Sequence, residues 1–141
     1  MSIKPKVDNL ILILLILLMI AIIVFVFLEV YPFEVVRYNS PFKVLTPVVK
    51  AGDDMLYERS GEKFIDATAR LACSFEDDII YFIPDRVDNL PVGDIDGVRQ
   101  ITIPANLPPS TYVFKCTVTF KIHDFREVVH YFYTEEFEVI N

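Results

Sequence analysis

The chain has 141 residues and a formal net charge of −7. This length suits one ordinary domain, and the acidic balance argues against nucleic acid as a partner, because the phosphate backbone would be repelled. Hydrophobic residues make up 53% of the chain, and the N-terminal segment holds a disproportionate share of them.

Residues 10–28 form an uninterrupted run of 19 apolar residues. As a helix rising about 1.5 Å per residue, the run reaches about 28 Å, close to the ~30 Å hydrocarbon core of a bilayer. A helix buried in the core of a small domain would need a polar stripe. A cleaved signal peptide would end in small residues, whereas residues 25–30 are mostly bulky. We therefore expect an uncleaved signal anchor, with residues 1–8 as a short cytoplasmic tail and residues 9–29 as the transmembrane helix.

The charges that flank the apolar run bear on its orientation. Lys4 and Lys6 precede it, Glu29 follows it, and Arg37 is the first positive residue beyond it. Since positive residues tend to stay in the cytoplasm, we expect a single-pass protein of the cytoplasmic (inner) membrane. Its N-terminus would lie inside and its C-terminal domain outside, although Arg37 keeps the charge bias small.

Residues 30–42 interrupt the pattern with two prolines and a polar pair, which predicts a juxtamembrane stalk. Amphipathic aromatic side chains collect at the headgroup level of a bilayer. Tyr31, Phe33 and Tyr38 are therefore expected at the membrane interface, with the lipid bilayer as their partner.

The rest of the chain, residues 43–141, shows the period-two pattern of half-buried strands. The clearest strands are residues 63–75 and 111–122, each with one apolar face, and a turn at 123–126 joins the second of them to a strand at 127–140. Further strands are expected at 43–50, 54–59, 79–83 and 98–103, with residues 84–97 as the longest connection. Short strands separated by Pro, Gly and Asp predict an all-β fold, an antiparallel β-sandwich, with a small barrel as the alternative.

One stretch resembles a known family. Residues 107–112, Leu-Pro-Pro-Ser-Thr-Tyr, followed by an alternating strand, resemble the approach to the sixth strand of immunoglobulin-like and fibronectin type III-like domains. The resemblance implies an immunoglobulin-like β-sandwich in which Tyr112 is a tyrosine corner that hydrogen-bonds to the preceding loop. The chain has no Trp, so Tyr81 or Phe82 would take the place of the family's core tryptophan. The whole chain also resembles short, membrane-anchored proteins encoded by tailed phages.

The same resemblance matches Cys73 and Cys116 to the second and sixth strands, which carry the family's inter-sheet disulfide. Such a bond would close a 43-residue loop and stabilise the domain by about 4 kcal/mol in the chain-entropy model. It would need an oxidising compartment, in agreement with a domain outside the cytoplasm. The alternative is two separate buried thiols, which applies if the domain faces the cytoplasm.

The sequence carries no motif for catalysis or metal binding. It has no Gly-x-Ser-x-Gly, Cys-x-x-Cys or His-Glu-x-x-His. The two histidines, His123 and His130, belong to no motif of this kind. Four aspartates crowd residues 84–97, where a calcium site is the alternative to an ordinary solvated loop: Asp85, Asp88, Asp94 and Asp96. We expect no catalytic residue, no metal and no cofactor.

These patterns favour a non-enzymatic, membrane-anchored structural or interaction module that presents an immunoglobulin-like domain outside the cytoplasmic membrane. Its partner would be another protein, and Tyr131, Phe132 and Tyr133 form a candidate patch on the last strand, with ordinary sheet packing as the alternative. The alternative function is an accessory or assembly subunit of a larger membrane or phage-encoded envelope complex.

Overall fold

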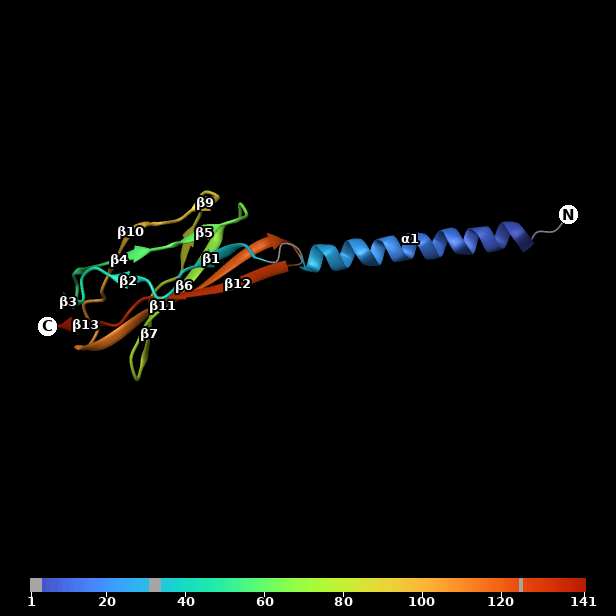
Figure 1. Cartoon of the computed structure of the whole chain (residues 1–141). Coiled ribbons are helices and arrows are strands. Elements are labelled where there is room, and N and C mark those ends of the chain that lie inside the picture. Colours follow the sequence, from blue (N-terminus) through green and yellow to red (C-terminus); the bar gives the residue numbers. More distant parts are fainter. Residues whose placement is uncertain (1–3, 31–33, 125) are drawn as a thin grey trace. The chain divides into compact units, whose positions relative to one another are not determined.

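The computed structural model describes residues 4–30, 34–124 and 126–141 (Figure 1). The chain divides into two compact units, residues 1–33 and 34–141. The first contains the single helix among the described residues, and the second contains the strands.

Helix α1 (Lys4–Val30) is apolar on every side from Val7 onward except at Asp8, Asn9 and Glu29. Its apolar side chains are exposed rather than packed in a protein core. The 25 residues of Lys6–Val30 are long and apolar enough to cross a membrane, since 25 residues of helix extend about 37 Å. A membrane anchor and a signal sequence near an N-terminus share these properties.

The folded unit is a β-sandwich of two layers. The first layer contains two three-stranded sheets, with the strand orders β10-β4-β2 and β1-β5-β9. The two sheets are consecutive in the chain, because β4 is followed at once by β5 and β9 is followed at once by β10. The strands of this layer are β1 (Val36–Tyr38), β2 (Lys43–Val44), β4 (Asp54–Arg59), β5 (Gly61–Lys63), β9 (Gly93–Asp94) and β10 (Gly97–Thr102).

The second layer is one seven-stranded sheet with the order β3-β13-β11-β6-β7, in which β12 also pairs with β11 and β8 with β6. Neighbouring strands are antiparallel, except that β3 runs parallel to β13. The strands of this layer are β3 (Val48–Lys50), β6 (Ala69–Glu76), β7 (Ile80–Phe82), β8 (Arg86–Asp88), β11 (Ser110–His123), β12 (Arg126–Tyr133) and β13 (Phe137–Ile140).

Aromatic rings fill the space between the layers. Tyr57 of β4 meets Phe114 of β11 with ring centroids 5.9 Å apart, which joins one layer to the other. Phe114 lies 5.1 Å from Phe75 of β6, and Phe42 lies 5.0 Å from Phe132 of β12. Such tilted and edge-on pairs are favourable beyond the area they bury, so a ring cluster supplies the core in a chain that has no Trp.

The expected substitutes for tryptophan lie elsewhere. Phe82 is 79% exposed, so it contributes nothing to the core. Tyr81 is half-buried and meets Tyr112 edge-on at 5.9 Å, near the border of the core. The fully buried ring of β6 is Phe75, near the end of the strand.

The expected stalk differs most from the structure. Residues 34–42 belong to the folded unit, because Val35, Val36 and Phe42 are buried in its core. Strand β1 pairs with β5, and Gly61 allows this close approach, because a Cβ at this position would clash with the carbonyl oxygen of Arg37. Asn39, Ser40 and Pro41, which suggested a stalk, lie in the connection between β1 and β2, whereas Pro32 lies outside the described residues.

Three of the expected strands are shorter than the sequence pattern suggested. The strand expected at 43–50 divides into β2 in the first layer and β3 in the second. The strand expected at 63–75 begins only at Ala69, because Lys63 ends β5 in the first layer and residues 64–68 connect it to β6 in the second. In this connection the ammonium group of Lys63 donates a 2.6 Å hydrogen bond to the carbonyl oxygen of Ala67. The strand expected at 127–140 breaks after Tyr133, where Thr134 forms an isolated parallel bridge with Phe42. The long connection at 84–97 contains the short strands β8 and β9.

Candidate functional site

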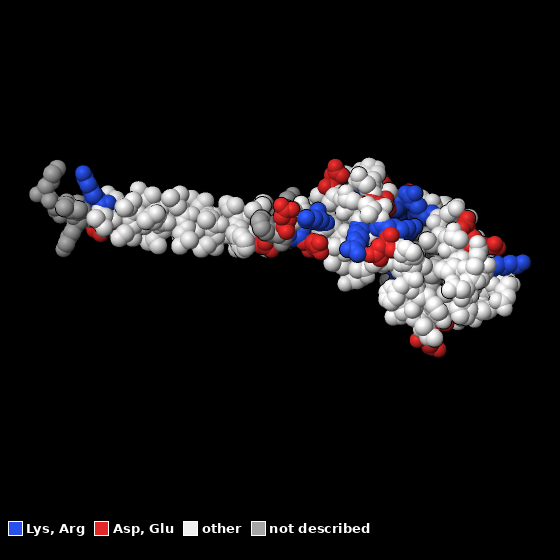
Figure 2. Space-filling model, turned by 180° about the vertical axis from the view of Figure 1, so that it is seen from behind, with Lys and Arg blue, Asp and Glu red and all other residues white. Residues whose placement is uncertain are grey.

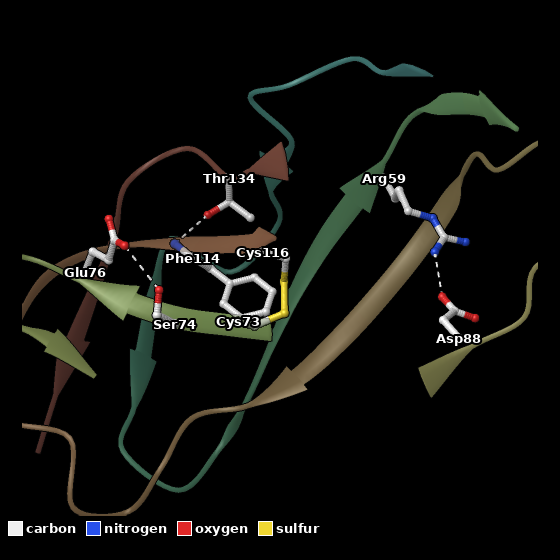
Figure 3. The surroundings of a disulfide bond; sticks show 8 residues. All are labelled: Arg59, Cys73, Ser74, Glu76, Asp88, Phe114, Cys116 and Thr134. Atoms are coloured by element: carbon white, nitrogen blue, oxygen red, sulfur yellow. Dashed lines mark hydrogen bonds and ion pairs between the residues drawn. A yellow bond between two sulfur atoms is a disulfide. The ribbon is translucent and has the colours of Figure 1, made fainter. Parts of the chain in front are cut away.

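The two cysteines form a disulfide bond, as the resemblance implied, but its position differs (Figure 3). Cys73 on β6 and Cys116 on β11 are directly opposed in the antiparallel register of neighbouring strands, with a Cα–Cα distance of 4.1 Å. The expected inter-sheet bond is therefore wrong: the bond lies within one sheet. Period-two alternation places both side chains on inward faces, but it does not say which of the two sheets each strand joins.

Tyr112, the expected tyrosine corner, is fully buried at the start of β11. Its hydroxyl donates a hydrogen bond of 2.6 Å to the carbonyl oxygen of Pro108, four residues upstream. Burial raises the pKa of Tyr112 to about 12, with a smaller contribution from Asp77. The hydroxyl is therefore a neutral donor that holds the loop before β11 against the sheet.

The expected membrane-interface residues divide into two groups. Tyr31 and Phe33 lie outside the described residues. Tyr38 is half-buried inside the folded unit, where its ring lies 5.0 Å from that of Phe132 and 6.1 Å from that of Phe42. Tyr38 thus takes part in the packing of β1 against β12, and its contact with lipid stays a prediction.

Three of the four aspartates of the long connection each contact a different protein group. Asp85 binds Arg70 at 2.7 Å, Asp88 lies 3.7 Å from Arg59, and Asp96 accepts a hydrogen bond from the backbone N–H of Gly61. Within residues 4–30, 34–124 and 126–141, no three His, Cys, Asp or Glu side chains gather in a way that would hold a metal ion.

Exposed aromatic side chains gather on the solvent side of the second layer. Phe82 of β7, Tyr131 of β12 and Tyr133 of β12 are 79%, 69% and 44% exposed. We call these three residues the outer aromatic face. Tyr131 and Tyr133 belong to the patch expected from the sequence, whereas Phe132 alternates inward into the core and Phe82 was not expected here.

The strand register explains how this face forms a groove. Tyr133, Lys115, Ser74 and Phe82 are successive partners across β12, β11, β6 and β7, so two rings stand at the ends of a row with smaller residues between them. Neighbouring strands are about 4.8 Å apart, which separates the two ends by about 14 Å. The resulting groove has a volume of about 610 Å³.

The floor of the groove carries balanced charge. Lys115 of β11 forms a 2.5 Å ion pair with Glu76 of β6, and Ser74 donates a 3.2 Å hydrogen bond to the same carboxylate. Thr117 of β11 faces Ala72 of β6 in the next row, and both side chains are small. The groove therefore offers apolar rims, a small polar floor and no net charge.

Two buried cations were missed by the sequence analysis. Arg59 is the last residue of β4 and lies on the same buried face as Met55 and Tyr57, at alternate positions of the strand. Lys63 lies on the buried face of β5. Both are buried, and charged residues are rarely buried unless they serve a specific partner. A charge at an inward position of a predicted strand is the signal that would have identified them.

Comparison with known proteins identifies no family for this chain. No protein-family model and no curated protein matches it, so the resemblance to tailed-phage proteins finds no support. Among solved structures it is similar to the CARDB domain of a Pyrococcus furiosus protein, solved in complex with di-metal ions. The identity is 11%, the TM-score 0.44, and the match covers 76% of this chain and 90% of that one.

It is also similar to part of a β-glucosidase from Listeria innocua, solved in complex with glucose. The identity is 12% and the TM-score 0.36, and the match covers 75% of this chain but only 16% of the enzyme. At these values neither likeness identifies a family or an activity, and the fold rests on the strand pairing and core described above.

Proposed function

We propose that the chain is a membrane-anchored, non-enzymatic interaction module that presents its β-sandwich outside the cytoplasmic membrane and binds another protein through the outer aromatic face. The main observation in support is that Phe82, Tyr131 and Tyr133 are exposed along one groove. Aromatic side chains are enriched in the buried centres of protein interfaces. A groove without net charge gives no advantage to nucleic acid or to an anionic lipid surface, so a protein surface with apolar side chains suits it best.

The placement outside the cytoplasm rests on two observations. Cys73 and Cys116 form a disulfide bond, and disulfide bonds form and persist mainly in oxidising compartments. Lys4 and Lys6 precede the apolar helix and Glu29 stands at its other end, the charge order of a segment whose N-terminus stays inside. A retained anchor also agrees with the bulky residues at the end of the helix, which suit signal cleavage poorly.

Topology is tested in intact bacterial cells with a membrane-impermeant protease and a thiol reagent. We expect external protease to remove the folded unit, and both cysteines to react under denaturing conditions only after reduction. A folded unit that is protected in intact cells, with thiols that react directly, would place it in the cytoplasm and contradict this part of the proposal.

The binding face is tested by photo-crosslinking in membranes. A photoreactive amino acid replaces Tyr131 or Phe82, and Glu58, an exposed residue of β4 in the other layer, serves as the matched control position. We expect a discrete adduct with one protein from positions 131 and 82, lost with Tyr133→Ser, and none from position 58. Equal adducts from all three positions would reject a specific face. Several adducts in fixed proportion from both layers would indicate a subunit embedded in a larger membrane complex.

A further inference from the structure

A second hollow lies in the folded unit, away from the outer aromatic face. It has a volume of about 500 Å³, and residues of β4 and β10 in the first layer and of β6 and β8 in the second line it. We call it the arginine cleft, because three arginines line it together with two tyrosines and one carboxylate: Arg59, Arg86, Arg99, Tyr38, Tyr57 and Asp88.

Arg59 lies deepest in the cleft. Its side chain is only 8% exposed; Nε donates a 2.9 Å hydrogen bond to the carbonyl oxygen of Ile95, and Nη1 lies 3.7 Å from Asp88 (Figure 3). The remaining nitrogen, Nη2, is buried and has no hydrogen-bond partner among the residues that the structure describes. A buried guanidinium donor without an acceptor is unfavourable, so this atom marks a position where an acceptor would be stabilising.

Two further arginines approach Arg59 from opposite layers. Arg99 of β10 is the direct cross-strand partner of Tyr57, and Arg86 of β8 is the partner of Leu71. The positive charge of Arg86 opposes the effect of burial, which raises the pKa of Tyr57, and the charge of Arg99 adds to the effect of burial in lowering the pKa of Arg59. Both arginines are exposed, so they stand at the mouth of the cleft while Arg59 stands at its base.

The charge in the cleft opposes that of the whole chain. Three arginines and one aspartate line it, within a protein of net charge −7. Figure 2 shows Lys and Arg side chains gathered on one face of the folded unit, with acidic side chains close by. Like charges held together without a matching counter-ion repel one another, and this repulsion is relieved when an anion binds between them.

We propose that the arginine cleft binds an oxyanion, the phosphate or carboxylate group of a small-molecule ligand. The planar guanidinium fork matches both groups, each of which accepts paired hydrogen bonds. The volume exceeds that of the anion alone and falls in the range of small-molecule sites. The rings of Tyr38 and Tyr57 and the side chain of Leu71 supply apolar wall for the rest of the ligand. This proposal is independent of the outer aromatic face and of membrane orientation.

The test uses the full chain in a neutral detergent, with arginine side-chain N–H signals followed by nuclear magnetic resonance. Inorganic phosphate and, separately, acetate are titrated against sodium chloride at matched ionic strength. We expect saturable shifts of a subset of arginine signals with at least one of the two anions. Arg99→Gln, at the exposed mouth, should weaken that binding at least about tenfold, the effect of losing one charge-assisted hydrogen bond.

Arg70→Gln is the matched control, because Arg70 is an exposed arginine paired with Asp85 on another surface, and it should leave the dissociation constant within about twofold. Tighter phosphate binding would identify a phosphate-bearing ligand, and tighter acetate binding a carboxylate-bearing one. The proposal is overturned if neither anion saturates by about 100 mM, or if Arg99→Gln and Arg70→Gln respond alike. Arg59→Met, provided that its strand signals match the wild type, should abolish saturation.

Discussion

Two buried polar side chains of the sandwich, those of Lys63 and Thr134, make hydrogen bonds where regular strands are interrupted. Lys63 donates hydrogen bonds to the carbonyl oxygens of Ala67 and Leu90 at 2.6 and 2.7 Å, and burial lowers the pKa of its ammonium group against the opposing influence of Asp66 and Asp88. Thr134 accepts a hydrogen bond from the backbone N–H of Phe114 at the break between β12 and β13. Polar groups buried in this way stay favourable only while their partners remain in place.

Tyr112→Phe tests one such partner. The substitution removes the hydroxyl that binds Pro108 and leaves a carbonyl oxygen without its donor, so we expect a loss of about 1–2 kcal/mol in the free energy of unfolding. Guanidinium unfolding of the full chain in detergent measures it. Tyr131→Phe is the control, because Tyr131 is exposed, and it should change stability by less than about 0.5 kcal/mol. An equal effect of both substitutions would contradict the role given to Tyr112.

His130 gives the folded unit a pH dependence of known sign. Its ring is half-buried beside Phe120, and burial lowers the pKa of the imidazole below its ordinary value of 6.5, while Glu34 acts in the opposite direction to a smaller extent. The unfolded chain therefore takes up a proton more readily than the folded one. The contribution of His130 to stability is complete above pH 6.5 and declines as the pH falls below it.

The measurement compares His130→Gln with the wild type. Between pH 7.5 and 5.5 the wild type should lose more of its free energy of unfolding than the variant does. Parallel pH profiles for the two proteins would show that His130 is not the group responsible.

At the scale of strands, the alternation of apolar and polar residues predicted where the long strands lie but not where they begin and end. The apolar faces expected for 63–75 and 111–122 are the buried faces of β6 and β11, because a half-buried strand needs side chains of one kind at every second residue. The stretch expected at 63–75 is divided because Lys63 ends β5, where it pairs with Gly93 of β9, 30 residues away. The break after Tyr133 coincides with the bridge between Thr134 and Phe42, which are 92 residues apart in sequence. Local patterns hold no information about such distant partners.

The disulfide joins two central strands, and reduction tests what it contributes. In the chain-entropy model the bond between Cys73 and Cys116 stabilises the folded unit by about 4 kcal/mol, since it closes a long loop in the unfolded chain. We expect the guanidinium midpoint to fall when a reductant is added. The Cys73→Ala/Cys116→Ala variant should match the reduced protein and ignore the reductant. A midpoint that stays unchanged on full reduction would refute this contribution.

At the scale of the molecule, the apolar run of residues 10–28 predicted a separate N-terminal helix. The period-two alternation and the turn residues of the rest predicted the β-sandwich. The functional surfaces were only partly foreseeable. Tyr131 and Tyr133 stand out in the sequence, but Phe82 reaches the same groove through the pairing of β7 with β6. The arginine cleft draws Arg59, Arg86 and Arg99 from three strands in two layers, so only the tertiary structure brings them together.

The proposed anchor has enough hydrophobicity to tolerate one charge. Seventeen of the residues at 10–28 are Leu, Ile, Val or Phe, each favouring insertion by about 0.3–0.6 kcal/mol, whereas a central arginine opposes it by about 2.5–3.5 kcal/mol. Leu18→Arg should therefore remain resistant to alkaline carbonate extraction. Leu14→Arg/Leu18→Arg should be extracted in substantial part. Release of the unmodified chain by carbonate would show that the helix is not retained as an anchor.

The bond between Cys73 and Cys116 also limits how far the chain can extend under tension. Residues 34–141 would span about 390 Å when fully extended at about 3.6 Å per residue. The 43-residue separation between the cysteines removes about 150 Å of that reach while the bond is closed. Tension between residue 34 and the C-terminus would thus extend the unfolded chain to less than two thirds of its full length, and reduction of one bond would release the remainder.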